Sequence, residues 1–269
     1  MKRLIYFVTL LGLVAATGAY AQVSTINSAV ITSRVFNDIP GATFTSANGF
    51  FTSLSEAGVS APTGFANRDI WRFSNNGSTP YQFQSGDYFN ASFNLTLTGS
   101  GTPGIGLEAG WLFSNPSGSI GGDLQSLVTA AGVVVQFGGP SYYPFSPAAG
   151  GFPGAGGSVP NYVLGETYTM GLNYVIDPNT GRNAFQYSVN GVLAASSPGN
   201  TYFDLGPGQS IGNVGDMLGG YFQIQNDPNN PANGGTARFQ DLTITAVPEP
   251  ATSVFLGLGM LALVYRRRR

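Results

Sequence analysis

Two stretches of this chain place an apolar residue at every second position. Residues 91–98 carry Ala, Phe, Leu and Leu at every second position, with Ser, Asn and Thr between them. Residues 168–176 carry Tyr, Met, Leu, Tyr and Ile in the same way. Successive side chains of a β-strand point to opposite faces, so a period of two predicts strands with one face on a core.

Several shorter segments between turn signals also read as strands. They are residues 70–74, 107–113, 133–137, 185–189, 220–225 and 237–245. Short helices are expected only at 124–131 and 53–57. Turns are predicted at 177–181 and at Asn190-Gly191, where both central residues of a type I′ hairpin need positive φ. This pattern predicts an all-β fold, an antiparallel β-sandwich or barrel.

Composition excludes many catalytic and metal-binding classes. The chain has no Cys and no His, and its only lysine is Lys2. Disulfides, Cys or His zinc sites, Cys nucleophiles, Ser-His-Asp triads and Schiff bases are therefore excluded. Carboxylate chemistry and oxygen-ligated Ca²⁺ remain open.

The first 21 residues have the features of a secretory signal peptide. Lys2 and Arg3 precede an apolar run at 4–16, and Ala19 and Ala21 form a small-x-small cleavage site. We therefore expect residues 1–21 to be removed after handling by Sec-type export machinery. Residues 22–246 are left as one β-sandwich domain, large enough for a sizeable core.

The body of the chain is acidic. Between Gln22 and Val247 there are five arginines and twelve acids, a net charge of −7. Such a surface has no basic patch that would attract nucleic acid.

The last residues, 247–269, combine three features in a fixed order. Pro248, Glu249 and Pro250 come first, an apolar run at 251–265 follows, and Arg266, Arg267, Arg268 and Arg269 end the sequence. As a helix the run would be roughly 22 Å long, against about 30 Å of hydrocarbon, so it would be a short transmembrane helix. The arginines would be a cytoplasmic anchor.

This tail resembles the PEP-CTERM sorting tail of exported bacterial proteins. The resemblance implies recognition and cleavage by an exosortase. The protein would be tethered for a time at the inner membrane and would then pass to the cell surface or the extracellular matrix. A tail anchor that is never cut is the alternative.

The order of the strands is similar to that of concanavalin A-like and laminin-G-like jelly rolls. The matching segments are a strand at 168–176, a turn, a strand ending in Asn190-Gly191, and a closing pair at 221–225 and 239–244. The resemblance implies two antiparallel sheets, one of them curved, whose concave face binds or cleaves glycans in relatives.

A ligand face on such a sandwich would use aromatic and acidic side chains. The candidates are Trp71, Glu108, Trp111, Tyr142 and Tyr143. Trp71 could instead be a core residue, and Tyr142 and Tyr143 lie in a Gly- and Pro-rich segment at 138–160 that could be a plain long loop. No Glu-x-Asp-x-x-Glu strand of the related glucanases is present. We therefore expect no catalytic residues.

Two loops have oxygen-bearing residues that a calcium ion could use. Asp227 and Asn229 lie in one, and Asp177 and Asn179 in the other. Asn and Asp are also the commonest turn residues, and we favour a turn without metal or other cofactor at both places.

Three hypotheses follow from the sequence. The first is an exported, non-catalytic protein that binds extracellular polysaccharide. The second is a glycan hydrolase or lyase that uses carboxylates, which need to lie in a pair. The third is a structural component of the extracellular matrix without a ligand.

Overall fold

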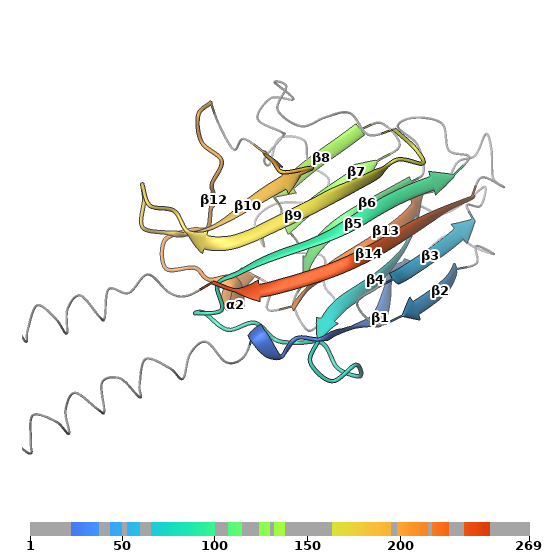
Figure 1. The fold of residues 1–269 in the computed structure, drawn as a ribbon, viewed down its shortest axis with the longest axis horizontal. Coiled ribbons are helices and arrows are strands. Elements are labelled where there is room, and N and C mark those ends of the chain that lie inside the picture. Colours follow the sequence, from blue (N-terminus) through green and yellow to red (C-terminus); the bar gives the residue numbers. More distant parts are fainter. Residues whose placement is uncertain are drawn as a thin grey trace, which may run out of the picture.

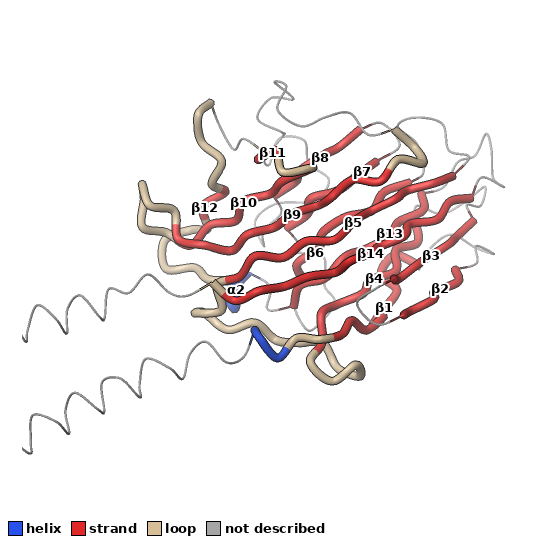
Figure 2. Tube along the Cα trace, in the orientation of Figure 1, coloured by secondary structure: helices blue, strands red, loops and turns tan. Residues whose placement is uncertain are grey.

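The computed structural model describes the chain in segments. These are residues 23–37, 44–49, 53–59, 66–99, 107–114, 124–129, 132–137, 163–194, 198–214, 217–225 and 234–247. They form two antiparallel sheets laid face to face (Figure 1). Helical structure in this part is limited to η1 (Val23–Thr25) and α2 (Ile211–Val214), as Figure 2 shows. Neither described helix has the length and apolar character needed to cross a membrane.

One sheet has six strands. In spatial order they are β1 (Ser28–Asn37), β4 (Ala66–Ser74), β13 (Met217–Gln225), β6 (Leu107–Ser114), β7 (Leu124–Thr129) and β8 (Gly132–Phe137). β13, near the end of the chain, lies between β4 and β6. Strands far apart in sequence are thus neighbours at the centre of the sheet.

The other sheet has eight strands. Its order is β11 (Val192–Leu193), β10 (Asn183–Val189), β9 (Thr167–Ile176), β5 (Phe89–Gly99), β14 (Gly234–Ala246), β3 (Ser53–Val59) and β2 (Phe44–Gly49), and β12 (Phe203–Asp204) pairs with β10. The all-β sandwich predicted from alternation is therefore confirmed. The signal helix and the apolar C-terminal helix expected from the sequence lie outside the described residues.

The predicted strands are confirmed, but both predicted helices are wrong. Residues 124–129 form β7, which pairs with β6 and β8, and residues 53–59 form β3, which pairs with β2 and β14. An isolated helix of one or two turns is marginal in water, whereas a strand between two partners gains backbone hydrogen bonds on both sides. Pairing with neighbouring strands therefore determined that both segments are strands and not helices.

An aromatic layer fills the space between the sheets. Trp71 of β4 contacts Phe93 of β5 and Phe239 of β14, with ring centroids 5.8 and 5.4 Å apart. Trp111 of β6 contacts Phe93 at 4.3 Å. Both tryptophans have 0% of their surface exposed. Trp71 and Trp111 are core residues, so the prediction that they line a ligand face is wrong.

Two adjacent glycines let β13 approach β4 closely. A Cβ on Gly220 would lie 2.7 Å from the indole atoms of Trp71, and one on Gly219 would collide with the Trp71 carbonyl oxygen. The neighbours are a packed ring and a backbone, and neither can swing away. The centre of the six-stranded sheet therefore requires glycine at both positions.

The predicted turns are present. Asn190 and Gly191 join β10 to β11 with φ of 51° and 78°, as a type I′ turn needs. Between β9 and β10, the Asp177 carboxylate accepts hydrogen bonds from the Asn179 backbone N–H at 2.8 Å and from Thr180 Oγ1 at 3.2 Å. Burial alone would raise the pKa of Asp177, but these hydrogen bonds outweigh it and hold the pKa below its ordinary value.

Replacing either glycine of β13 with alanine should destabilise the sandwich. We expect Gly219→Ala and Gly220→Ala each to lower the free energy of unfolding by about 1–3 kcal/mol, because a methyl group is forced into filled space. Urea denaturation would measure the free energy of unfolding of each variant. Gly212→Ala is the matched control, since its Cβ would meet nothing nearer than 3.7 Å. Equal stability of all three variants would contradict the close-approach argument.

Asp177→Asn should remove a pH-dependent part of the stability. The folded pKa is lowered, so the carboxylate stabilises the fold above the unfolded value of about 3.9, and this is lost as the pH falls through the folded pKa. The difference in Tm between wild type and Asp177→Asn should therefore be largest at neutral pH and shrink in acid. Thermal melts across this range test it, and a constant difference would disprove the pKa argument.

Candidate functional site

β4 breaks the alternation expected of a strand at a protein surface. All nine of its residues are buried. Trp71 and Phe73 point into the aromatic layer, whereas Ile70 belongs to a separate cluster with Leu112 of β6 and Tyr221 of β13. The second cluster lies on the face of the six-stranded sheet that points away from the eight-stranded sheet, because its members alternate with core residues along each strand. We call this side the outer face.

A row of polar side chains crosses three strands of the outer face. Register places Gln223 of β13 opposite Arg68 of β4 on one side and Glu108 of β6 on the other. Arg68 Nε donates to Gln223 Oε1 at 2.7 Å, and Gln223 Nε2 donates to Glu108 Oε2 at 3.2 Å. Arg68, Gln223 and Glu108 together are the polar row.

An aromatic ring and a second arginine lie beside the polar row. The Arg68 guanidinium carbon sits 4.5 Å from the ring centroid of Tyr221, which is cation–π geometry. Further along β4, Arg72 is opposite Gly219 and is also buried. The outer face therefore combines two guanidiniums, an amide, a carboxylate and a phenol.

The groups of the polar row are almost completely buried. Arg68 and Gln223 have 0% of their surface exposed, and only Glu108 is partly exposed. Taking a guanidinium out of water is costly, and well-packed apolar residues of similar volume are often at least as stable. Ile70 and Leu112 show that the same face accepts such residues. The polar row is therefore a local departure from the apolar packing at Ile70 and Leu112.

The residues paired with Glu108 in the sheet register are a glutamine and a threonine. Its register neighbours are Gln223 on β13 and Thr129 on β7. Retaining or inverting glycoside hydrolysis needs two carboxyl groups. The described geometry at Glu108 is thus an acid beside an amide, which suits hydrogen bonding to a ligand.

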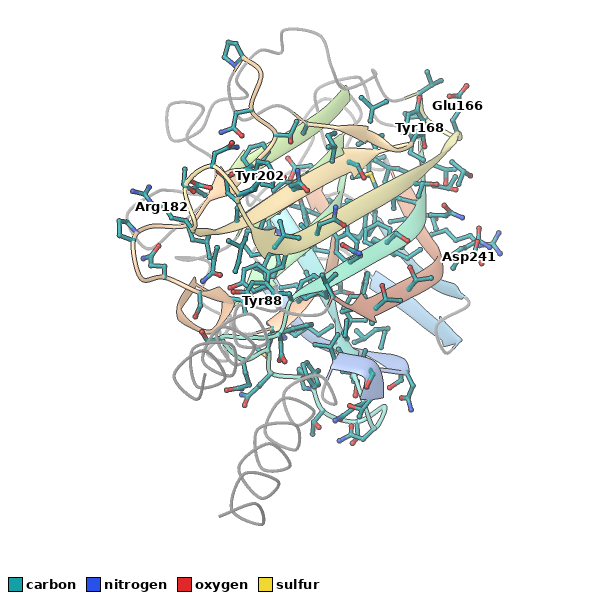
Figure 3. The ribbon with its side chains drawn as sticks, turned by 60° about the vertical axis from the view of Figure 1, so that its left-hand side comes forward. Tyr88, Glu166, Tyr168, Arg182, Tyr202 and Asp241 are labelled. Carbon is teal, nitrogen blue, oxygen red and sulfur yellow. The ribbon has the colours of Figure 1, made fainter. Side chains whose placement is uncertain are left out.

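The open face of the eight-stranded sheet is polar in a different way. Thr96 Oγ1 and Thr167 Oγ1 lie 2.6 Å apart, and Asn94 Nδ2 donates to Asp241 Oδ2 at 2.8 Å (Figure 3 labels Asp241). Ser92 and Thr243 are joined in the same way at 2.7 Å. These side chains satisfy one another across strands, as on a solvated sheet.

The site residues predicted from the sequence have different outcomes. Glu108 lies on the outer face as expected for a strand glutamate, whereas Trp71 and Trp111 lie in the core. Several others lie outside the described residues: Tyr142, Tyr143, Asp227, Asn229, the signal cleavage residues Ala19 and Ala21, the Pro248–Glu249–Pro250 motif, and the anchor residues Arg266, Arg267, Arg268 and Arg269.

Sequence reasoning missed Arg68, Tyr221 and Gln223. A signal was present, because Arg68 and Arg72 are separated by even steps along β4 and Tyr221 and Gln223 along β13. Even spacing places such residues on one face of a strand. Only the pairing of β13 with β4 and β6 brings them together.

Metal ligands do not gather in the described part of the chain. No group of three or more acids lies close enough there to hold an ion. The carboxylate of Asp177, one of the residues considered for calcium, is used by its own turn.

Comparison with solved structures gives distant likenesses to sandwich proteins. An endo-1,3-beta-glucanase from Streptomyces sioyaensis is 10% identical, with 83% of this chain and 98% of that chain covered and a TM-score of 0.44. The PL7 alginate lyase AlyA1 from Zobellia galactanivorans is 14% identical, with 84% and 99% covered and a TM-score of 0.42. The carbohydrate-binding module CBM66 from Bacillus subtilis is 15% identical, with 77% and 96% covered and a TM-score of 0.39. These scores are too low to transfer a ligand or an activity.

Sequence comparison identifies the tail of the chain but not its body. No curated protein matches the chain. Residues 246–269, by contrast, match the model of the PEP-CTERM protein-sorting motif. The order Pro-Glu-Pro, apolar run and arginine cluster agrees with this match. The chain therefore ends in a PEP-CTERM protein-sorting motif, and the protein is an exported, cell-surface-sorted one.

Proposed function

We propose that this exported protein is non-catalytic and binds extracellular polysaccharide through the outer face of the six-stranded sheet. The observation that supports it is the polar row, in which Arg68, Gln223 and Glu108 are joined across three strands. The partly exposed Glu108 carboxylate offers acceptors for the hydroxyl groups of a sugar chain, and the buried Gln223 and Arg68 hold it in fixed register. The Tyr221 ring packs against Arg68 and is itself buried.

Export and sorting deliver the sandwich to its ligand in this proposal. Residues 1–21 are removed during export by Sec-type machinery, and residues 251–265 hold the protein at the inner membrane until an exosortase acts at Pro248–Glu249–Pro250. The body then passes to the cell surface or the extracellular matrix. Its net charge of −7 and its lack of lysine give it no attraction for nucleic acid.

Removing the polar row should weaken glycan binding and leave the Tm nearly unchanged. We expect the double variant Arg68→Met/Gln223→Met to bind glycans at least tenfold more weakly, a loss of about 1.4 kcal/mol. Its Tm should be close to that of wild type, because both partners of the buried Arg68–Gln223 hydrogen bond are replaced by apolar groups of similar size and the partly exposed Glu108 carboxylate can accept from water in place of Gln223. A glycan array of neutral and acidic polysaccharides measures the first quantity and calorimetry the second.

Arg238→Met is the matched control, since Arg238 is exposed on β14 of the other sheet. A large fall in Tm without loss of glycan binding would make the row structural and contradict the proposal. No binding by wild type to any glycan would favour the structural matrix role. Shortening of a bound glycan during incubation would instead reveal a hydrolase or lyase.

Replacement of Pro248, Glu249 and Pro250 with alanines should leave the tail uncut. The exosortase would lose its recognition element, so the protein should stay in the membrane fraction with its full mass. Mass spectrometry and cell fractionation measure this. Pro198→Ala, in an exposed loop of the body, is the control and should be processed normally. If the alanine variant is processed at the normal rate, recognition lies elsewhere in the tail.

A further inference from the structure

The sorting motif follows the folded body without a spacer. The motif begins at residue 246, which is the last residue of β14 and pairs with Phe89. The next residue, Val247, still donates its backbone N–H to the Tyr88 carbonyl at 2.9 Å. Pro248 comes directly after it and has no N–H to continue the pairing. Only Pro248, Glu249 and Pro250 separate the sheet from the apolar run.

One end of the sandwich surrounds the point where β14 ends. Tyr88 is joined through its hydroxyl to Asn183 Oδ1 at 2.8 Å, and Asn183 Nδ2 donates to the Gln209 carbonyl at 2.8 Å. The loop at 75–88, the turn at 177–183 and the loop at 205–210 therefore lie together around Val247. Figure 1 shows the β9–β10 turn, α2 and the end of β14 at this same end. We call these three segments and Val247 the tail end.

The tail end is acidic like the rest of the body, but two of its acids are buried. Its described residues, with the neighbouring strand β12, include four charged side chains: Asp87, Asp177, Arg182 and Asp204. Asp87 is 5% exposed and accepts hydrogen bonds from Tyr81 and Gln84, and Asp177 is 1% exposed. Arg182 is exposed to solvent and is labelled in Figure 3.

Chain length then limits how far this end can stand from a bilayer. Three extended residues reach about 10 Å, and each headgroup layer is roughly 5–7 Å thick. An apolar helix of roughly 22 Å is shorter than the hydrocarbon core of about 30 Å, so it has no extra residues that could lengthen the connection to the folded body. If residues 251–265 insert, as the proposed function holds, the tail end must meet the headgroups.

We infer that the tail end is a membrane-facing surface, which rests on the phospholipid headgroups until the tail is cut. This deepens the proposed function and rests on the insertion of the tail that it includes. The short connection at residues 248–250 keeps the tail end close to the bilayer. The burial of Asp87 and Asp177 limits repulsion by lipid phosphates, Asp204 is partly exposed, and the exposed Arg182 adds attraction. The outer face is held to one side of this contact, so it can meet polysaccharide before release.

The absence of cysteine makes a direct test possible. Single cysteines would be placed at Ser85 in the tail end, at Thr167 near the opposite end of β9, and at Leu258 in the tail. Ser85 and Thr167 are both exposed. Each labelled protein, exported and with its tail uncut, is reconstituted into vesicles of phosphatidylcholine and phosphatidylglycerol. Fluorescence is then quenched by lipids that carry a quencher on the headgroup or on the acyl chain.

We expect the headgroup quencher to reduce emission at Ser85→Cys several-fold more than at Thr167→Cys, and the acyl-chain quencher to reduce emission at Leu258→Cys. Quenching at Leu258 with equal, weak quenching at Ser85 and Thr167 would overturn the inference and leave the sorting proposal intact. No quenching at Leu258 would overturn the insertion itself. Quenching at Ser85 that needs an exosortase in the same vesicles would replace lipid by the enzyme as partner.

A spacer variant tests the cause of the contact. A flexible Gly-Ser segment of about twelve residues between Val247 and Pro248 spans roughly 20 Å. Quenching at Ser85 should then fall to the level at Thr167 while quenching at Leu258 is unchanged. Persistent quenching at Ser85 would contradict the short tether as its cause.

Discussion

The packing around Trp71 holds the two sheets of this protein together. The indole contacts rings from both sheets, with Phe73 at 5.5 Å and Phe239 at 5.4 Å, and it lies over Gly220 of the neighbouring strand. The chain has no cysteine, so no disulfide shares this role. Edge-to-face aromatic contacts in a close-packed layer provide the cohesion that small exported domains often obtain from disulfides.

The same register that builds this layer also builds the candidate site. Side chains on β4, β13 and β6 alternate between the aromatic layer and the outer face, so placing Trp71 in the core places Arg68 outside it. A slip of one residue would exchange the two faces. Gly219 and Gly220 allow β13 to lie close against β4, and this brings Gln223 into hydrogen-bond reach of Arg68. The same strand register therefore determines both the core packing and the polar row.

The termination of β14 connects the fold with sorting. Val247 is held by Tyr88, and the PEP-CTERM motif starts within the last pairs of the sheet. In the proposed tethered state, a folded body attached this closely could not rotate freely above a membrane, so its orientation would follow from its topology. In a chain with a long linker, the same sandwich and the same tail would be independent of each other.

The sequence by itself determined the local properties of this protein. Alternation at 91–98 and 168–176 gave strands, Asn190-Gly191 gave a hairpin turn, and the order of residues in the tail gave its sorting role. Each depends on residues close together in the chain. The absence of Cys and His likewise excludes whole classes of site, whatever fold the chain adopts.

Only the tertiary structure decided what depends on distant partners. Whether Trp71 faced a ligand or the core, and whether 124–129 was a helix or a strand, depended on which strands lay beside them. Glu108 and Gln223 are 115 positions apart, and no local pattern pairs them. The physical reason is that local propensity is worth a fraction of a kcal/mol per residue, whereas burial and sheet pairing are worth more and involve residues remote in sequence.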